Sequence, residues 1–204
     1  MSFDDRTLFV GLLAVGWLFV GCGRDRSEAP EGVQTPSAAA ASIVPAETPS
    51  EAAKTKMLAA KEALFTKLSS RLMEAMSGPG PASAISVCQQ EAPKIAATVG
   101  EEQGVRIGRT GVRLRNPKNA APSWAESLVN ERTETPTFVV LDNGDSAALL
   151  PIKLQGQCLM CHGPKEQIAP VIQDQLAKLY PNDEATGFQQ DELRGWFWIE
   201  LPPG

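Results

Sequence analysis

The chain has 204 residues, of which 43% are hydrophobic, so it is long enough to bury the core of one domain of ordinary size. Its formal net charge of −5 argues against nucleic acid as a partner, because binding to phosphates needs a positive surface. The sequence contains no repeat at the periods typical of solenoids or propellers.

The first residues are typical of an export signal. The uncharged run 7–20 is short for a membrane span but has the right length for the hydrophobic region of a signal peptide. It leads into Phe19-Val20-Gly21-Cys22, which resembles the lipobox of bacterial lipoproteins. We interpret residues 1–21 as a lipoprotein signal peptide and Cys22 as the lipidated residue, with an uncleaved anchor or an ordinary signal peptide as alternatives. The predicted location is the periplasmic face of a bacterial membrane, reached through a lipid anchor.

Residues 22–50 are rich in Ala, Pro, Ser, Thr and Glu and contain no aromatic residue. This composition buries too little apolar surface to offset the entropy lost on folding, so we predict a flexible linker. The folded domain is expected to span residues 51–204.

Two helices are predicted at the start of this domain. The first is a long amphipathic helix that begins near Glu51 and ends at the turn cluster 78–81. Its apolar face is predicted to comprise Leu64, Phe65, Leu68, Leu72 and Met76. The second helix covers about residues 82–99 and directs Cys88 inward with an apolar stripe. The other members of that stripe are Ile85, Ala92, Ile95 and Val99.

The middle of the domain is predicted to be mainly β-structure. Residues 105–115 alternate between apolar and basic side chains, which indicates a strand with one basic face. A turn at 116–119 and a short helix capped by Ser123 follow. The runs 137–141 and 147–154 flank Asn143-Gly144, which is a strong hairpin signal.

The C-terminal part is predicted to hold one further helix and one further strand. Apolar residues at helical spacing from Ile168 to Leu179 indicate a helix, which Pro181 terminates. The run 193–201 is typical of a final strand.

Between the hairpin and this helix, residues 158–162 spell C-x-x-C-H, the pattern by which a c-type haem is attached. The thiols of Cys158 and Cys161 can each add to one vinyl group of a porphyrin, and the adjacent His162 can then reach the iron. The alternatives are a disulfide, a thioredoxin-like redox pair or half of a zinc site. A zinc site would need further ligands, yet His162 is the only histidine. A redox pair normally opens a helix, whereas Gly163-Pro164 follows this motif closely.

A haem at this motif would need further contacts. The iron's second axial ligand could be Cys88, a methionine, Tyr180 or a lysine, or the position could be open. The methionines considered are Met57, Met73 and Met76, for which core packing is the better interpretation. The haem propionates need cationic partners, which Arg109, Arg113 and Arg115 could provide; the alternative is a solvated strand face.

Several short motifs occur in a fixed order and carry a family resemblance. They are Ala84-Ile85-Ser86-Val87-Cys88, Ala92-Pro93-Lys94-Ile95-Ala96, Arg109-Thr110, Arg115-Asn116-Pro117-Lys118-Asn119 with Trp124, the C-x-x-C-H motif with Gly163, Tyr180-Pro181, Ala185-Thr186-Gly187-Phe188 and Arg194-Gly195. Over about residues 51–203 the chain resembles a bacterial family of single-haem c-type proteins of unknown function with a PAS-like domain. Two positions depart from the pattern: Gly111 replaces a serine, and Gln190-Asp191 replaces a Gly-Asp turn.

The resemblance implies an α+β fold in which helices flank a small PAS-like antiparallel sheet. It also implies one covalent haem c whose iron is ligated by His162 and by Cys88. The four cysteines then divide between lipid (Cys22), porphyrin (Cys158 and Cys161) and iron (Cys88), which leaves none for a structural disulfide.

The predicted function is that of an exported haem protein that senses redox state or a small ligand, or carries single electrons at low potential. It would act with a separate redox or signalling protein, because no output domain follows the haem motif. The sequence offers no paired carboxylates or Ser/His arrangement for catalysis, so we do not assign an enzymatic role. The alternative is a haem enzyme of peroxidase or reductase type with an open distal site, in which Cys88 only packs.

Overall fold

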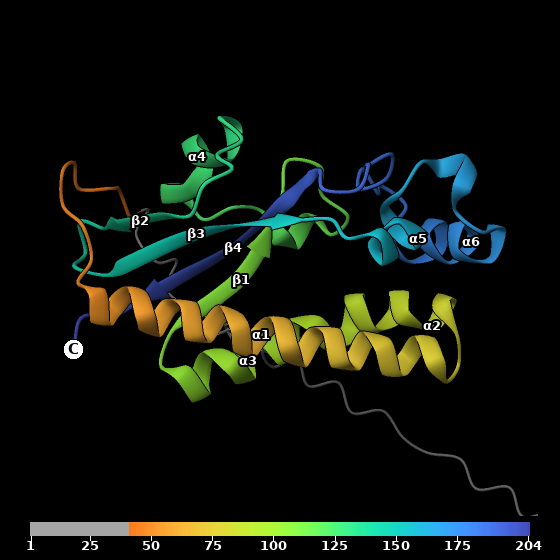
Figure 1. Ribbon diagram of the computed structural model, residues 1–204, viewed down its shortest axis with the longest axis horizontal. Coiled ribbons are helices and arrows are strands. Elements are labelled where there is room, and N and C mark those ends of the chain that lie inside the picture. Colours follow the sequence, from red (N-terminus) through yellow and green to blue (C-terminus); the bar gives the residue numbers. More distant parts are fainter. Residues whose placement is uncertain (1–40) are drawn as a thin grey trace, which may run out of the picture. The chain divides into compact units, whose positions relative to one another are not determined.

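Figure 1 shows the computed structural model, which describes residues 41–204. The predicted signal peptide, Cys22 and most of the predicted linker lie outside the described residues. The α-helices are α1 (Glu51–Ser77), α2 (Pro81–Ser86), α3 (Ala92–Gln103), α4 (Glu126–Asn130), α5 (Leu159–His162) and α6 (Pro170–Leu179). The strands are β1 (Arg106–Thr110), β2 (Thr137–Val140), β3 (Ser146–Lys153) and β4 (Leu193–Leu201).

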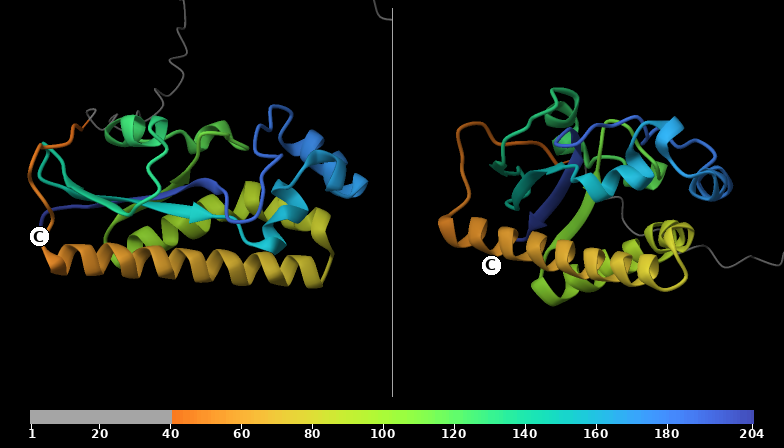
Figure 2. Two further views of the ribbon diagram at one scale, coloured as in Figure 1. Left: turned by 45° about the horizontal axis from the view of Figure 1, so that its top comes forward. Right: turned by 45° about the vertical axis from the view of Figure 1, so that its right-hand side comes forward.

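The strands form one antiparallel sheet in the order β1-β4-β3-β2, with a helical layer on each face. Helices α1 and α3 cover one face, and the segment that contains α4 covers the other (Figure 2). Met57 and Leu64 of α1 are fully buried in the first of these cores, where each contributes about 1.5–3 kcal/mol of apolar burial. This arrangement confirms the predicted α+β fold.

Helix α1 has the predicted bounds. Its first turn is capped by Ser50, whose hydroxyl oxygen accepts a hydrogen bond from the amide of Ala53 at 3.2 Å. The predicted apolar face is wrong at Phe65, which is 42% exposed. Consecutive residues lie about 100° apart around a helix, so with Leu64 buried against the sheet Phe65 is turned toward solvent.

The folded part begins before Glu51, so the predicted linker boundary at residue 50 is corrected. The amide of Val44 donates to the carbonyl oxygen of Val140, and the amide of Asp142 donates to that of Ser42, both at 2.9 Å. Ile43 forms an isolated antiparallel bridge with Leu141. Residues 42–44 therefore extend the β2 edge of the sheet.

The predicted second helix is interrupted. Between α2 and α3 the chain forms a π-helical turn, η1 (Val87–Glu91), in which the amide of Ala92 bonds to the carbonyl oxygen of Val87. Pro93 accounts for the interruption, because in a regular α-helix its ring would clash with the carbonyl group of Gln89. The wider turn relieves this clash, and it places Cys88 within the π-helical segment.

The predicted strand 105–115 is too long, because β1 ends at Thr110. Thr110 is paired with Trp196 of β4, and the next position of β4 is Gly195, where a Cβ atom would lie 2.0 Å from the Thr110 carbonyl oxygen. The two segments lie very close here, and β1 forms no ladder pair beyond Thr110. Arg113 and Arg115 therefore lie on an irregular segment instead of a strand face.

The remaining elements agree with the sequence prediction apart from one cap. β2 and β3 form the predicted hairpin, in which Thr137 is paired with Leu149 and Gly144 adopts a φ of +85°. Helix α6 and strand β4 are also confirmed. Ser123 does not cap the helix that follows, since its hydroxyl group donates to the carbonyl oxygen of Ala41 at 3.4 Å. Within residues 41–204, no helix combines the length and the apolar content that crossing a membrane requires.

Candidate haem-binding site

The C-x-x-C-H motif forms one short helical segment near the end of β3. Cys158 ends the 3-10 turn η4 (Gly156–Cys158), and Cys161 and His162 lie on α5 directly after it. α5 ends at Gly163, where the close approach of the Leu159 carbonyl oxygen leaves no room for a side chain: a Cβ atom would lie 2.6 Å from it. Both cysteines are free thiols and partly exposed. The two thiols and the imidazole therefore lie within little more than one helical turn.

The imidazole of His162 is held in a fixed orientation by backbone contacts. Its Nδ1 atom lies 2.8 Å from the carbonyl oxygen of Ala185, to which it donates its proton. The carbonyl oxygen of His162 itself accepts from the amide of Phe188 at 3.0 Å, and the Phe188 ring lies edge-on to the imidazole at 6.4 Å. Burial lowers the pKa of His162 well below its ordinary value, and the charges of Arg115 and Arg194 lower it further. The ring is neutral, and its Nε2 lone pair is the one left for a metal.

Arg115 connects the cysteine motif to the loop that holds His162. Its Nε donates to Asp183 at 3.0 Å in an ion pair whose two side chains are each 9% exposed. Its Nη2 donates to the carbonyl oxygens of Cys161 at 2.6 Å and Ala185 at 3.3 Å. Asp183 in turn accepts from the amide of Ala185 at 2.8 Å. One buried ion pair therefore fixes the backbone on both sides of the imidazole.

The other two arginines predicted to contact a haem lie in different surroundings. Arg113 stacks on the Phe188 ring at 3.5 Å, and its Nη2 donates to Glu192 at 2.8 Å. Arg109, on the edge strand β1, lines a cavity together with Cys88. Arg109 is therefore the only one of the three predicted arginines that lines the same cavity as Cys88.

The cavity at Cys88 has a volume of about 280 Å³ and a largely apolar wall. Its lining residues include Cys88, Ala92, Pro93, Ala96, Ala97 and Trp198. Arg109 and Lys118 provide the positive charge. An apolar wall with two cations matches the chemistry of a porphyrin, which has a flat apolar ring and two carboxylates.

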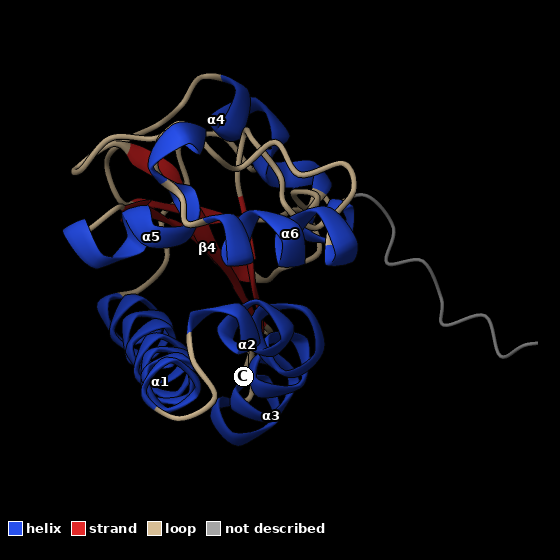
Figure 3. Ribbon diagram, turned by 90° about the vertical axis from the view of Figure 1, so that its right-hand side faces the viewer, coloured by secondary structure: helices blue, strands red, loops and turns tan. Residues whose placement is uncertain are grey.

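Cys88 is close to the cysteine motif although it lies far from it in the sequence. Burial raises the pKa of the Cys161 thiol, and Cys88 contributes to the same shift. Burial also raises the pKa of Tyr180 to about 12, again with a contribution from Cys88. Ile85 on α2 packs in one cluster with Tyr180 and the α6 side chains, and Cys161 lies against this cluster. In the view of Figure 3, α5 and α6 lie in the upper half of the domain, and α1, α2 and α3 lie in the lower half.

The methionines considered as iron ligands lie elsewhere among the described residues. Met57 is fully buried in the core between α1 and the sheet, and Met76 packs in a small cluster with α2. Met73 is 54% exposed on α1. None of the three lines the cavity at Cys88.

Sequence reasoning missed two features of this region. The first is the π-helical turn around Cys88, for which Pro93 was an available signal. The second is Arg194, whose guanidinium lies 5.4 Å from the Phe188 ring and lowers the pKa of His162. Arg194-Gly195 was part of the family resemblance, but no local pattern indicated that this arginine approaches the histidine.

The donor groups of this region fit a c-type haem. The two thiols are free, the imidazole is neutral with Nε2 available, and a third thiol lies nearby on η1. Within residues 41–204, no three His, Cys, Asp or Glu side chains gather as a metal site made only of protein ligands would need. An iron that brings its own porphyrin nitrogens needs only one or two protein ligands.

Comparisons with known proteins place these observations in a family. Residues 39–202 match the model of the Tll0287-like family. A solved structure, the cyanobacterial heme-protein Tll0287, is similar with a TM-score of 0.57 and 22% sequence identity. The match covers 76% of this chain and 98% of that protein. No curated protein matches the chain at a significant level.

Proposed function

The chain belongs to the Tll0287-like family, and from that premise we propose that it is a haem-binding protein. Haem is attached covalently as haem c through Cys158 and Cys161, with His162 as the proximal ligand. One observation carries this proposal: the Nδ1 proton of His162 is engaged by Ala185, while two free thiols lie on the same short segment. The named property of the cyanobacterial relative, a heme-protein, supports the same conclusion.

Cys88 is the second axial ligand in this proposal. Its thiol lines the apolar cavity and is close enough to Cys161 and Tyr180 to act on their charges, which supports a place for it beside the cysteine motif. A thiolate donates charge to the iron and favours Fe(III), which gives a lower potential than His/Met ligation. Ligation also favours the thiolate form of Cys88, because the deprotonated sulfur is the ligating species.

With both axial positions filled, the protein acts as a redox or small-ligand sensor or as a low-potential single-electron carrier. A haem held here would supply an iron that changes between Fe(III) and Fe(II). The protein's part is to hold the imidazole neutral through burial and to fix its ring plane through Ala185 and Arg115. The partner is a separate redox or signalling protein.

The chain is exported and lipid-anchored through Cys22 in this proposal, at the periplasmic face of a bacterial membrane. The lipobox-like sequence supports it, and c-type haem is attached on that side of the membrane. Mass spectrometry of the mature protein tests it, since a lipid on Cys22 is expected and an unmodified Cys22 would contradict the anchor.

The haem proposal is tested by expressing the full chain with a cytochrome c maturation system and staining a denaturing gel for haem. A stained band at the mass of the chain is expected, because thioether bonds survive denaturation. An unstained band from protein that folds normally would overturn covalent attachment.

A further inference from the structure

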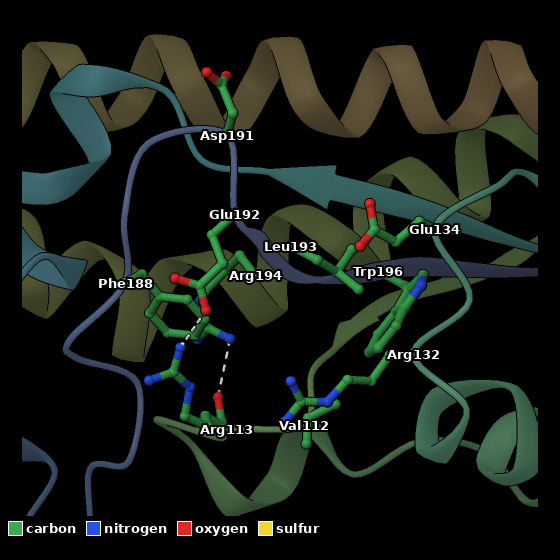
Figure 4. Close-up of a pocket in the computed structure, with 10 residues that line it drawn as sticks. All are labelled: Val112, Arg113, Arg132, Glu134, Phe188, Asp191, Glu192, Leu193, Arg194 and Trp196. Carbon is green, nitrogen blue, oxygen red and sulfur yellow. Dashed lines mark hydrogen bonds and ion pairs between the residues drawn. The ribbon is translucent and has the colours of Figure 1, made fainter.

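Among the described residues, Arg194 is a buried cation that forms no ion pair of its own, because Asp183, the carboxylate that acts on it, is already paired with Arg115. Its Nη1 donates to the carbonyl oxygen of Arg113 at 2.9 Å, as drawn in Figure 4. Its Nε is the one buried side-chain polar atom among residues 41–204 that has no hydrogen-bond partner. Within the same residues Arg194 forms no ion pair, although several other arginines lie near it. Leaving a buried guanidinium unpaired is costly. Nε itself is closed off from solvent, so an external acceptor would bind at Nη2, for which the described residues provide no partner.

The surrounding chain makes room for this guanidinium. A Cβ atom at Gly111 would lie 2.8 Å from Arg194 Nη1 and 2.8 Å from the Arg194 carbonyl oxygen, so glycine allows these two segments to approach closely. Burial, together with the charges of Arg115 and Arg109, lowers the pKa of Arg194 to about 10. The guanidinium still carries its charge at neutral pH.

Arg194 lines a cavity of about 150 Å³ near the start of β4. Arg132 extends into this cavity from the opposite wall (Figure 4), and it too forms no ion pair within the described residues. Three acids also line the cavity. Glu192 pairs with Arg113 and Glu134 pairs with Lys153, and Figure 4 shows the carboxylate of Asp191 turned away from Arg132 and Arg194. The apolar wall consists of Val112, Phe188, Leu193 and Trp196.

We infer that Arg194 and Arg132 form a binding site for a carboxylate group beside the proposed haem. Two guanidinium groups beside an apolar wall suit a carboxylate attached to a small hydrocarbon group. Such a group has two sources, namely a propionate of the haem itself or a small free monocarboxylate. The site lies next to His162, because Phe188 contacts both Arg194 and the imidazole. A negative charge bound there stabilises Fe(III) and lowers the haem potential, an effect that rests on the proposed function.

Calorimetric titration of the intact holoprotein with sodium acetate tests the free-ligand source, with acetamide at equal concentration as the neutral control. Saturable heat from acetate but not from acetamide is expected, with a potential that falls and saturates over the same concentration range. Arg132→Gln and Arg194→Lys are each expected to weaken acetate binding about tenfold, the effect of losing one charge-assisted hydrogen-bonding fork. Lys67→Gln, on the exposed face of α1, removes a positive charge away from the cavity and is expected to change nothing.

The propionate source predicts a different pattern. The holoprotein then gives no heat with acetate, but the propionate bending band of its resonance Raman spectrum shifts in Arg194→Lys and not in Lys67→Gln. Absence of both the acetate heat and the Raman shift would overturn the site. Arg132 is exposed, so Arg132→Gln is expected to fold and keeps the test decisive if Arg194→Lys does not.

Failure of the proposed function is recognised separately. Haem content is measured by haem stain on every preparation before titration. If the folded protein carries no haem, the haem proposal fails, while the acetate titration of that same protein still decides whether Arg194 and Arg132 bind a carboxylate.

Discussion

The Nδ1 atom of His162 lies 2.8 Å from the carbonyl oxygen of Ala185, and this contact sets which nitrogen faces a metal. The same carbonyl oxygen accepts from Nη2 of Arg115, which also holds the carbonyl oxygen of Cys161. The orientation of the imidazole and the backbone of the cysteine motif therefore depend on one guanidinium and on its partner Asp183. Arg115 can hold these backbone groups in place without contacting the haem.

Replacing Arg115 tests this role. Arg115→Gln leaves Asp183 buried without its ion-pair partner, so we expect the free energy of unfolding to fall by about 3–5 kcal/mol in urea titrations. Lys67→Gln is the matched control, because its pair with Glu102 is nearly half exposed on both sides and its loss should cost at most about 1 kcal/mol. Equal effects of the two substitutions would contradict the structural role of Arg115.

Covalent attachment is tested at the two motif cysteines. The double variant Cys158→Ser/Cys161→Ser is expected to lose all haem on a denaturing gel, while each single variant keeps one thioether and some stain. Cys88→Ala serves as the control, because Cys88 is proposed to bind iron and not porphyrin, and it should keep full stain. Loss of covalent haem in Cys88→Ala, with the chain still folded, would mean that attachment does not follow the motif.

The sequence predicted the elements whose signals are local. Helix α1 begins at a capping serine and ends at Gly78, the hairpin has Asn143-Gly144 at its turn, and β4 is an apolar run that ends at prolines. The errors arose where a distant segment decides the outcome. β1 ends at Thr110, where Gly195 of β4 lies close to it, and residues 42–44 pair with the end of β2 and the residues that follow it.

The same distinction applies to the site. The motif predicted Cys158, Cys161 and His162 from spacing alone, and helical spacing directed Cys88 toward the interior. The surroundings of the arginines were not predictable in this way, because their partners lie far along the chain. Arg115 pairs with Asp183, and Arg113 pairs with Glu192. Alternation along a presumed strand could not indicate these partners.

Tyr180 gives a prediction for alkaline pH. Burial raises its pKa to about 12 from an ordinary value of 10, so the folded state retains a proton that the unfolded state loses. The resulting stabilisation is complete below pH 10 and is lost as the pH rises toward 12. Tyr180 is the only tyrosine, so ultraviolet difference absorbance reports its ionisation directly. Ionisation near pH 10, or the same loss of stability in Tyr180→Phe, would contradict the burial of this side chain.

The π-helical turn predicts an effect of Pro93 on the iron ligand. Pro93→Ala supplies the missing amide and removes the clash with Gln89, so the segment can become a regular α-helix and rotate Cys88 out of place. We expect a decrease in the low-spin, thiolate-ligated fraction in the ferric absorption spectrum, with covalent haem retained. Pro79→Ala, in the turn after α1, is the control and should leave the spectrum unchanged. An unchanged spectrum in Pro93→Ala would show that Pro93 does not position Cys88.

The central claim is that one haem is bound between His162 and Cys88. Its most direct test is the absorption spectrum of the ferric protein, recorded through a redox titration for the wild type and for Cys88→Ala. We expect a six-coordinate low-spin thiolate spectrum with a low potential for the wild type, and a high-spin spectrum with a higher potential for Cys88→Ala. A wild-type spectrum that is already high-spin, and that changes readily with cyanide or peroxide, would contradict the account and favour a haem enzyme with an open distal site.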